Sequence, residues 1–171
     1  FMSWIASKSK SVYLVTGSDI SKTKEQLSED LMVACLGVFT CSGNVFRQED
    51  QIIYSNVFDP GDEFIADLEL YLENSQWRSK KGNHIEKRPG MLNFSTVGRN
   101  ANQNMRKAYA RWDKTSLERE DIVAYINDLY PDLEVSIGGS ISVDIYPKGK
   151  NKGQVVEKLR ELHGDNVEMI F

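Results

Sequence analysis

The sequence predicts an α/β protein in which a split core is interrupted by an inserted α+β module with an antiparallel sheet. Three observations support this class. The chain opens with a strand, loop and helix pattern, its middle holds alternating strands and amphipathic helices, and a last helix and strand return to the first pattern. We therefore expect one part of the core over residues 1–56, the inserted module over 57–148 and the rest of the core over 149–171.

The composition limits the possible functions. With 171 residues and 40% apolar content, the chain can bury a sizeable core, and its net charge of −4 gives no overall basic field for nucleic acid. Binding of an anion must then come from a local cluster of basic residues. The two cysteines form no metal-spaced set, and no apolar run approaches the roughly 20 residues that span a bilayer. We expect a reduced, cytoplasmic protein that contacts neither membrane nor nucleic acid.

The first core segment is expected to hold several short elements. Residues 11–16, SVYLVT, form an apolar run typical of a buried strand, and a helix is expected over 21–34. A second strand begins at Val38, and residues 44–47 and 51–54 resemble a hairpin. Before these elements, Phe1, Trp4 and Ile5 are spaced like the apolar face of a helix.

The inserted module is expected to alternate helices and strands. Apolar residues recur at helical spacing over 62–73, and a strand over 91–97 follows the turn Pro89-Gly90. The pattern Thr115-x-x-Glu118 predicts a capped helix over 116–129, and Gly138-Gly139 lies between two strands, 133–137 and 141–146. Helices are expected on one face of an antiparallel sheet.

The returning segment is simpler. Its helix should cover 153–163 with Gly164 as the C-cap, and residues 166–171 have the pattern of a final strand.

Three arginines stand out in the stretch RPGMLNFSTVGRNANQNMR, which holds no acidic residue. Arg88, Arg99 and Arg106 each offer a planar fork of donors that suits a phosphate. We expect them to lack carboxylate partners and to hold a small anion. The alternative is that each is a surface arginine that balances the acidic helices.

Weaker candidates lie elsewhere. Ser18 follows a core strand and could face a phosphate oxygen, although Ser18 or Asp19 could also simply cap the next helix. Strand alternation places Ser142 and Asp144 on one polar face, which could bind sugar hydroxyls or only meet solvent. Lys152 begins a helix and alone would be a solvated lysine. The histidines have no zinc-ligand spacing, and we expect no metal site in this chain.

Taken together, four motifs carry a family resemblance. The motifs LVTGSDISKTKEQL, RPGMLNFSTVGRN and SIGGSISVDIYP, followed by the lysine of NKG, resemble in order and spacing the eukaryotic-type phosphomannomutases. These belong to the haloacid dehalogenase (HAD) superfamily and carry a type IIB cap. The resemblance runs from about Lys10 to Phe171, and its most specific parts are GMLNxSxxGRN and GGxISxDxxP.

The resemblance implies a fold and a role for each candidate. It implies a Rossmann-like HAD core, here partial, with the inserted module as its cap. Ser18 matches the core serine that contacts the transferring phosphoryl group, and Lys152 matches the core lysine that balances charge. Arg88, Arg99 and Arg106 match cap arginines that hold the distal phosphate, while Ser142 and Asp144 match cap contacts to the sugar and its phosphate.

The resemblance also implies what these residues lack. The family's nucleophilic aspartate lies in a DxDxT motif, and its Mg²⁺ ligands lie in a later acidic motif. We expect both motifs to lie outside this chain. The chain alone should therefore not turn over substrate, and both flanks of a larger protein would be missing. Three departures, Ser42, Lys87 and Pro89, affect the expected sugar preference.

The implied activity of the whole protein is interconversion of mannose 6-phosphate and mannose 1-phosphate, with Mg²⁺ and a hexose bisphosphate activator, for GDP-mannose biosynthesis. A homodimer through the cap is also implied. Two alternatives stay open, a HAD-type sugar-phosphate phosphatase and a non-catalytic module that binds phosphosugars or dimerises.

Overall fold

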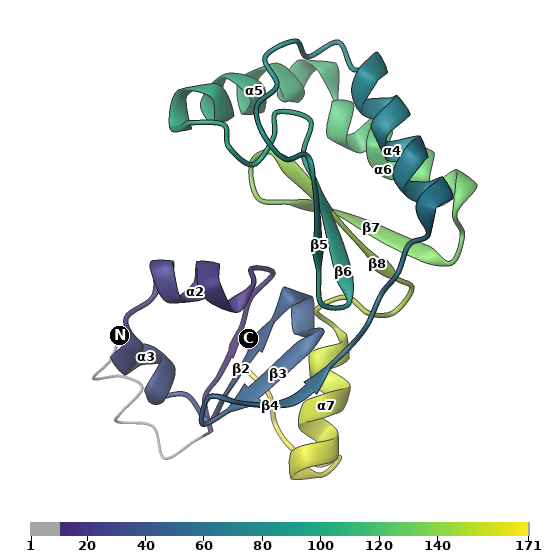
Figure 1. Ribbon diagram of the computed structural model, residues 1–171. Coiled ribbons are helices and arrows are strands. Elements are labelled where there is room, and N and C mark those ends of the chain that lie inside the picture. The colour runs from purple at the N-terminus through teal and green to yellow at the C-terminus, as the bar shows by residue number, and fades with distance from the viewer. Residues whose placement is uncertain (1–10, 171) are drawn as a thin grey trace. The chain divides into compact units, whose positions relative to one another are not determined.

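The chain divides into two compact units in a computed structural model that describes residues 11–170 (Figure 1). One unit combines Phe1–Asn56 with Gly149–Phe171, and the other is the continuous segment Val57–Lys148. We call them the split unit and the inserted unit. The helix expected around Phe1 lies outside the described residues. Among residues 11–170, no helix combines the length and apolar character needed to cross a membrane.

The split unit is built on a four-stranded sheet in the order β1-β2-β3-β4. The strand β1 (Tyr13–Val15) pairs in parallel with β2 (Gly37–Thr40), whereas β3 (Val45–Gln48) and β4 (Gln51–Ser55) add antiparallel pairs. Glu49 and Asp50 form the β3–β4 turn, and both have positive φ, as a tight hairpin turn requires. The predicted strands and hairpin are therefore present.

The helix expected over 21–34 is instead two helices, α2 (Ile20–Gln26) and α3 (Glu29–Val33). Leu27 leaves helical geometry, with φ −122° and ψ 144°. Ser28 then caps α3, because its hydroxyl accepts a hydrogen bond from the Leu31 N–H at 3.4 Å. A serine inside a helical pattern can start a new helix in this way, so the pattern gave the right class but not the break.

The helix α7 (Gln154–His163) packs against the sheet of the split unit. Its Val155 and Leu159 contact Phe39 and Phe46, whose rings stack with centroids 4.2 Å apart. Gly164 ends the helix at φ 88°, which confirms the predicted C-cap.

The strand predicted at the C-terminal end is absent from the described residues 166–170. Met169 instead packs against the cluster of Phe39, Phe46 and α7. The predicted strand is therefore wrong: Val167 and Met169 are only partly buried, and Ile170 is exposed.

The inserted unit is an antiparallel sheet with two helices on one face, as predicted (Figure 1). The strand order is β5-β6-β8-β7, with β5 at Ile85–Arg88, β6 at Met91–Phe94, β7 at Leu133–Gly138 and β8 at Ser142–Pro147. The helices α4 (Asp62–Asn74) and α6 (Glu118–Leu129) cover one side. The core between helices and sheet consists of nine buried residues: Phe64, Leu68, Leu92, Phe94, Ile122, Ile126, Val135, Val143 and Ile145.

A further helix, α5 (Gln103–Ser116), was not predicted. The Asn102 side chain caps it by accepting the Met105 N–H at 3.0 Å. Its apolar face is narrow, since Tyr109 is its fully buried anchor and packs with Val97, Ala101 and Ile141. Met105, Tyr109 and Trp112 recur at helical spacing and belong to this cluster, so the helical periodicity is present in the sequence but was missed among the polar residues.

The capping pattern predicted for α6 is wrong. Leu117, with φ 57°, separates α5 from α6, and the Thr115 hydroxyl donates to the Trp112 carbonyl at 2.9 Å. Glu118 turns inward, where it accepts hydrogen bonds from the hydroxyls of Tyr109, at 2.7 Å, and Ser75. The glutamate that suggested a cap therefore bridges α4 and α5 inside the unit.

Candidate functional site

The polar face of the inserted sheet is the main candidate site. Glu86, Asn93, Asp144 and Ser136 are cross-strand neighbours in one row across β5, β6, β8 and β7. Because side chains alternate along a strand, this row lies on the face opposite to Leu92, Val143 and Ile145, which meet the helices. The face therefore combines a carboxylate pair, an amide and a hydroxyl.

Two of the predicted arginines meet Glu86 on this face. The Nε and Nη2 of Arg88 both donate to Glu86 Oε2, the first at 2.9 Å, and the Nε of Arg99 lies 3.2 Å from the same oxygen. The expectation that these arginines lack a carboxylate was wrong. Glu86 lies two residues before Arg88, just outside the acid-free stretch 88–106. Because alternate residues of one strand share a face, Glu86 and Arg88 lie side by side.

Arg106 is held by backbone and not by an acid. It lies in the first turn of α5, where its Nε donates to the Ala101 carbonyl at 2.8 Å and its Nη2 donates to the Arg99 carbonyl at 2.7 Å. The guanidinium thus holds the loop that carries Arg99. Gly98 shapes the start of this loop at φ 88°, where an added Cβ would lie 2.1 Å from the Lys81 carbonyl oxygen.

Asp144 and Asn93 extend the cluster. Asn93 Nδ2 donates to Asp144 Oδ1 at 2.7 Å, and Arg99 Nη1 donates to Asn93 Oδ1 at 3.2 Å. Burial lowers the pKa of Arg99, with Glu86 and Asp144 opposing this effect and Arg88 and Arg106 adding to it. Both acids and the other two arginines therefore act electrostatically on Arg99. Asn93 was not among the predicted site residues, although it lies in the motif GMLNFS.

Ser142 lies two residues before Asp144, on the same side of β8. It is buried, and its hydroxyl donates to the Gly138 carbonyl at 2.9 Å across the hairpin. Gly138 in turn lies under Asp144, since an added Cβ would be 2.8 Å from Asp144 Oδ2. The five predicted residues of the inserted unit are therefore on or beside one sheet face, with Ser142 the most enclosed.

The other two predicted residues belong to the split unit. Ser18 lies in the loop between β1 and α2, where its carbonyl accepts the Cys41 N–H at 2.9 Å. Asp19, and not Ser18, caps α2 by accepting the Lys22 N–H at 2.8 Å. Lys152 is exposed in the turn before α7.

A buried loop links the segments that carry Ser18 and Lys152. Residues Cys41, Ser42 and Gly43 all have positive φ, which is uncommon for cysteine and serine and is typical of functional loops. Gln154 Nε2 donates to the Ser42 carbonyl at 3.0 Å and to the Lys150 carbonyl at 2.8 Å. Asn44 Nδ2 also donates to Lys150 at 3.0 Å. Neither amide was predicted, because a contact over more than 100 residues leaves no local pattern.

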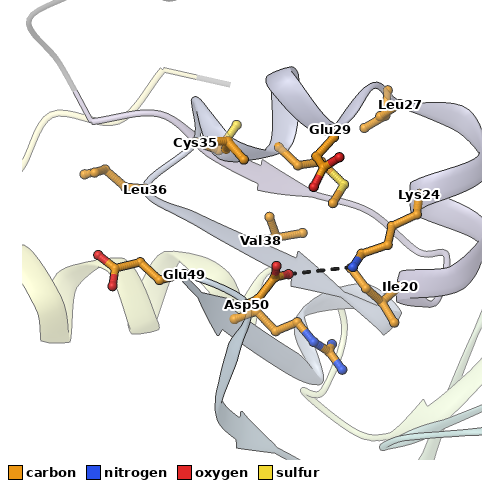
Figure 2. A pocket seen from close by; sticks show the side chains of 12 residues that line it. Ile20, Lys24, Leu27, Glu29, Cys35, Leu36, Val38, Glu49 and Asp50 are labelled. Atoms are coloured by element: carbon orange, nitrogen blue, oxygen red, sulfur yellow. Dashed lines mark ion pairs between the residues drawn. The ribbon is translucent and has the colours of Figure 1, made fainter.

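The split unit also contains a cavity of about 660 Å³ beside β2 and β3 (Figure 2). Its lining includes apolar side chains such as Met32, Leu36 and Val38, and Lys24 Nζ lies 3.7 Å from Asp50 Oδ1 at its edge. None of the predicted site residues lines it. The cavity is therefore not the candidate site.

Metal-ligating side chains do not cluster in the part of the chain that the structure describes. Over residues 11–170, no three side chains of histidine, cysteine, aspartate or glutamate gather in a way that could hold a metal ion. The nearest acidic pair on the candidate face, Glu86 and Asp144, is engaged by arginine and asparagine donors.

Comparison with known proteins decides the family. A family model described as eukaryotic phosphomannomutase matches residues 2–171, nearly the whole chain. The chain belongs to the eukaryotic phosphomannomutase family. The motifs around Arg88, Arg99 and Asp144 that suggested this resemblance all lie within the matched range.

Curated members of the phosphomannomutase family align over most of the chain. The phosphomannomutase of Arabidopsis thaliana is 34% identical over 168 residues, which cover 88% of this chain and 65% of the relative. That of Galdieria sulphuraria is 32% identical over 154 residues, 81% of this chain and 59% of the relative. The chain thus spans about three fifths to two thirds of the length of these relatives.

Solved structures show that this family member has the HAD fold. The C-terminal domain of Candida albicans trehalose-6-phosphate phosphatase superimposes with a TM-score of 0.60 at 18% identity, covering 96% of this chain and 52% of that one. A HAD subclass IIB sugar phosphatase gives 0.53 at 13% identity, with 95% and 66% covered. At such identities the likeness concerns the fold alone, and the predicted fold class is confirmed.

Proposed function

We propose that the protein to which this chain belongs is a phosphomannomutase that interconverts mannose 6-phosphate and mannose 1-phosphate. The observation that supports this most is the arginine site, which we define as Arg88, Arg99 and Arg106 on and beside the polar face of the inserted sheet. It occurs in a member of the phosphomannomutase family. In this proposal the inserted unit is the substrate-binding cap and the split unit is part of the catalytic core.

The chemistry of a mutase requires such a site. A phosphoryl group moves between two hydroxyls of one hexose through a bisphosphorylated sugar, so one phosphate must be held while the other reacts. Guanidinium forks bind phosphate oxygens through paired, charge-assisted hydrogen bonds and stay protonated at any working pH. We assign the non-reacting phosphate to the arginine site. The neighbouring polar groups Asn93, Ser142 and Asp144 then contact the sugar and its phosphate.

The reacting phosphate belongs to the core. We propose that Ser18 contacts the transferring phosphoryl group and that Lys152 balances its charge. The nucleophile would be an aspartate in a DxDxT motif, which does not occur in these 171 residues. Mg²⁺ would neutralise charge on the transferring phosphoryl group, and a hexose bisphosphate would prime the phosphoaspartate. The 171-residue chain alone should bind hexose phosphate without turning it over.

The same family membership supports three further proposals. The enzyme would work in the cytoplasm, would supply mannose 1-phosphate for GDP-mannose biosynthesis, and would form a homodimer through the inserted unit. Light scattering during size-exclusion chromatography measures the last of these, and a monomeric mass at micromolar concentration would contradict it.

An assay of the full-length protein tests the activity. Mannose 1-phosphate, Mg²⁺ and a hexose bisphosphate are supplied, and mannose 6-phosphate and free phosphate are followed together. We expect mannose 6-phosphate to form without matching phosphate release. Release of phosphate alone would identify a sugar-phosphate phosphatase, and a lack of either product in a full-length protein without DxDxT would leave a non-catalytic binding module.

A further inference from the structure

Glu86 holds an unusual place in the arginine site. A single carboxylate oxygen, Oε2, accepts hydrogen bonds from both Nε and Nη2 of Arg88 and lies 3.2 Å from Nε of Arg99. The Arg88 side chain is only 7% exposed and that of Arg99 is 24% exposed, whereas Glu86 is 31% exposed. The acid is therefore the more accessible partner of two largely buried cations.

These contacts occupy the donors that a phosphate would need. An oxyanion bound between Arg88 and Arg99 would use the Nε–H and Nη2–H groups of Arg88 that now donate to Glu86 Oε2, and would take the place of that oxygen beside Nε of Arg99. One carboxylate offers a single charge to two guanidinium groups. A phosphate monoester brings about two charges near neutral pH and three acceptor oxygens, so it can satisfy more of these donors than the carboxylate does.

The arginines do not depend on Glu86 alone for their positions. Arg99 also donates to Asn93, and the Arg99 N–H donates to the Asn83 carbonyl at 2.7 Å. Arg106 holds the carbonyls of Arg99 and Ala101. The loop that carries Arg99 would therefore stay in place if the Glu86 carboxylate swung toward solvent.

We propose that Glu86 is the resident counter-anion of the arginine site, and that a phosphate monoester binds by replacing its carboxylate on Arg88 and Arg99. This inference rests on the proposed function, because it assigns the arginine site to a phosphate. Glu86 is then an affinity-setting residue. It keeps two buried cations paired in the absence of ligand, and its displacement reduces the net affinity for phosphate.

The alternative role for Glu86 is a scaffold that orients the arginines for the ligand. The two roles predict opposite results. Removing a competitor tightens phosphate binding, whereas removing a scaffold weakens it. Shortening the side chain separates competition for donors from a general charge effect, because Glu86→Asp keeps the charge but draws the carboxylate back by one methylene.

The experiment measures binding of inorganic phosphate, and separately of mannose 1-phosphate, to the full-length protein by calorimetry and by NMR of the arginine Nε–H groups. We expect Glu86→Gln to lower the Kd for phosphate roughly three- to tenfold, the range set by the loss of one partly exposed ion-pair competitor. Glu86→Asp should lower it by a smaller factor, and Glu69→Gln, an exposed acid on α4, should leave it unchanged.

The outcomes are distinct. A weaker or unchanged affinity in Glu86→Gln, unmoved Nε–H resonances of Arg88 and Arg99 at saturating phosphate, or no phosphate binding by either protein would overturn the inference. Tighter phosphate binding in Glu86→Gln without any turnover of mannose 1-phosphate would support the role of Glu86 and contradict the proposed mutase activity instead.

Discussion

Arg106 offers the sharpest test of how the candidate site is held together. Its guanidinium donates to two backbone carbonyls, those of Ala101 at 2.8 Å and Arg99 at 2.7 Å. A hydrogen bond that involves a charged group contributes about 1.5–3 kcal/mol to stability. Because Arg106 is only half-buried and water can replace part of the loss, we expect Arg106→Ala to lower the free energy of unfolding by about 2 kcal/mol for both bonds together.

The assay is urea unfolding followed by tryptophan fluorescence. Trp77 and Trp112 pack around Tyr109 in the cluster that contains Ala101, so their emission reports on this part of the inserted unit. Arg111→Ala is the matched control, since it makes the same change on an exposed face of α5. If the two variants unfold at equal urea concentrations with equal slopes, Arg106 does not hold the loop.

Three further predictions concern other parts of the molecule. Gly138→Ala would place a Cβ 2.8 Å from Asp144 Oδ2, so the carboxylate would move and lose its hydrogen bond from Asn93. The affinity for hexose phosphate, measured by calorimetry, should fall about tenfold. The control Ser140→Ala should not change this affinity. Phe64→Ala should lower the free energy of unfolding, measured in urea, by about 3–5 kcal/mol because the Phe64 ring is fully buried. Leu70→Ala, on the exposed face of α4, should lower it by less than about 0.5 kcal/mol. Burial and then the charge of Glu161 raise the pKa of Tyr54 from 10.0 to about 12. The unfolded chain therefore loses this proton first, and stability should fall as pH rises from about 10 to about 12; Tyr54→Phe should flatten that fall, and an equally steep fall in the variant would refute the assignment.

The fold was predictable where side-chain periodicity was strong. The alternation of Val143 and Ile145 in β8 and the helical spacing of Phe64 and Leu68 both reflect burial against one common core, so each pattern identified the correct element and face. Prediction failed where one polar side chain decided the local structure. Ser28 divided a helix, and Glu118 was turned inward by Tyr109 and Ser75 instead of capping α6.

The sequence allowed the arginines of the candidate site to be predicted, but not the groups with which they form hydrogen bonds and ion pairs. Arg88, Arg99 and Arg106 were predicted as site residues because residues 88–106 hold three arginines and no acid, in a chain of net charge −4. Their partners, however, follow from strand register and loop shape. Glu86 reaches Arg99 only because β5 pairs with β6, and Arg106 reaches the Arg99 carbonyl only because Asn102 starts a helix there.

The way each arginine is held suggests how substitutions would act on the site. Arg106 donates hydrogen bonds to two backbone carbonyls, so its loss would disturb the loop that carries Arg99 as well as remove a charge. Arg88 and Arg99 instead share the oxygen of one side chain, Glu86, which can rotate away. Since a backbone carbonyl cannot leave its place while a partly exposed carboxylate can, a phosphate would exchange with Glu86 on the first pair and not with the partners of Arg106. Substitutions of Arg106 should therefore lower stability and affinity together, whereas Glu86→Gln should lower stability, because it removes a carboxylate from two largely buried cations, and at the same time tighten phosphate binding.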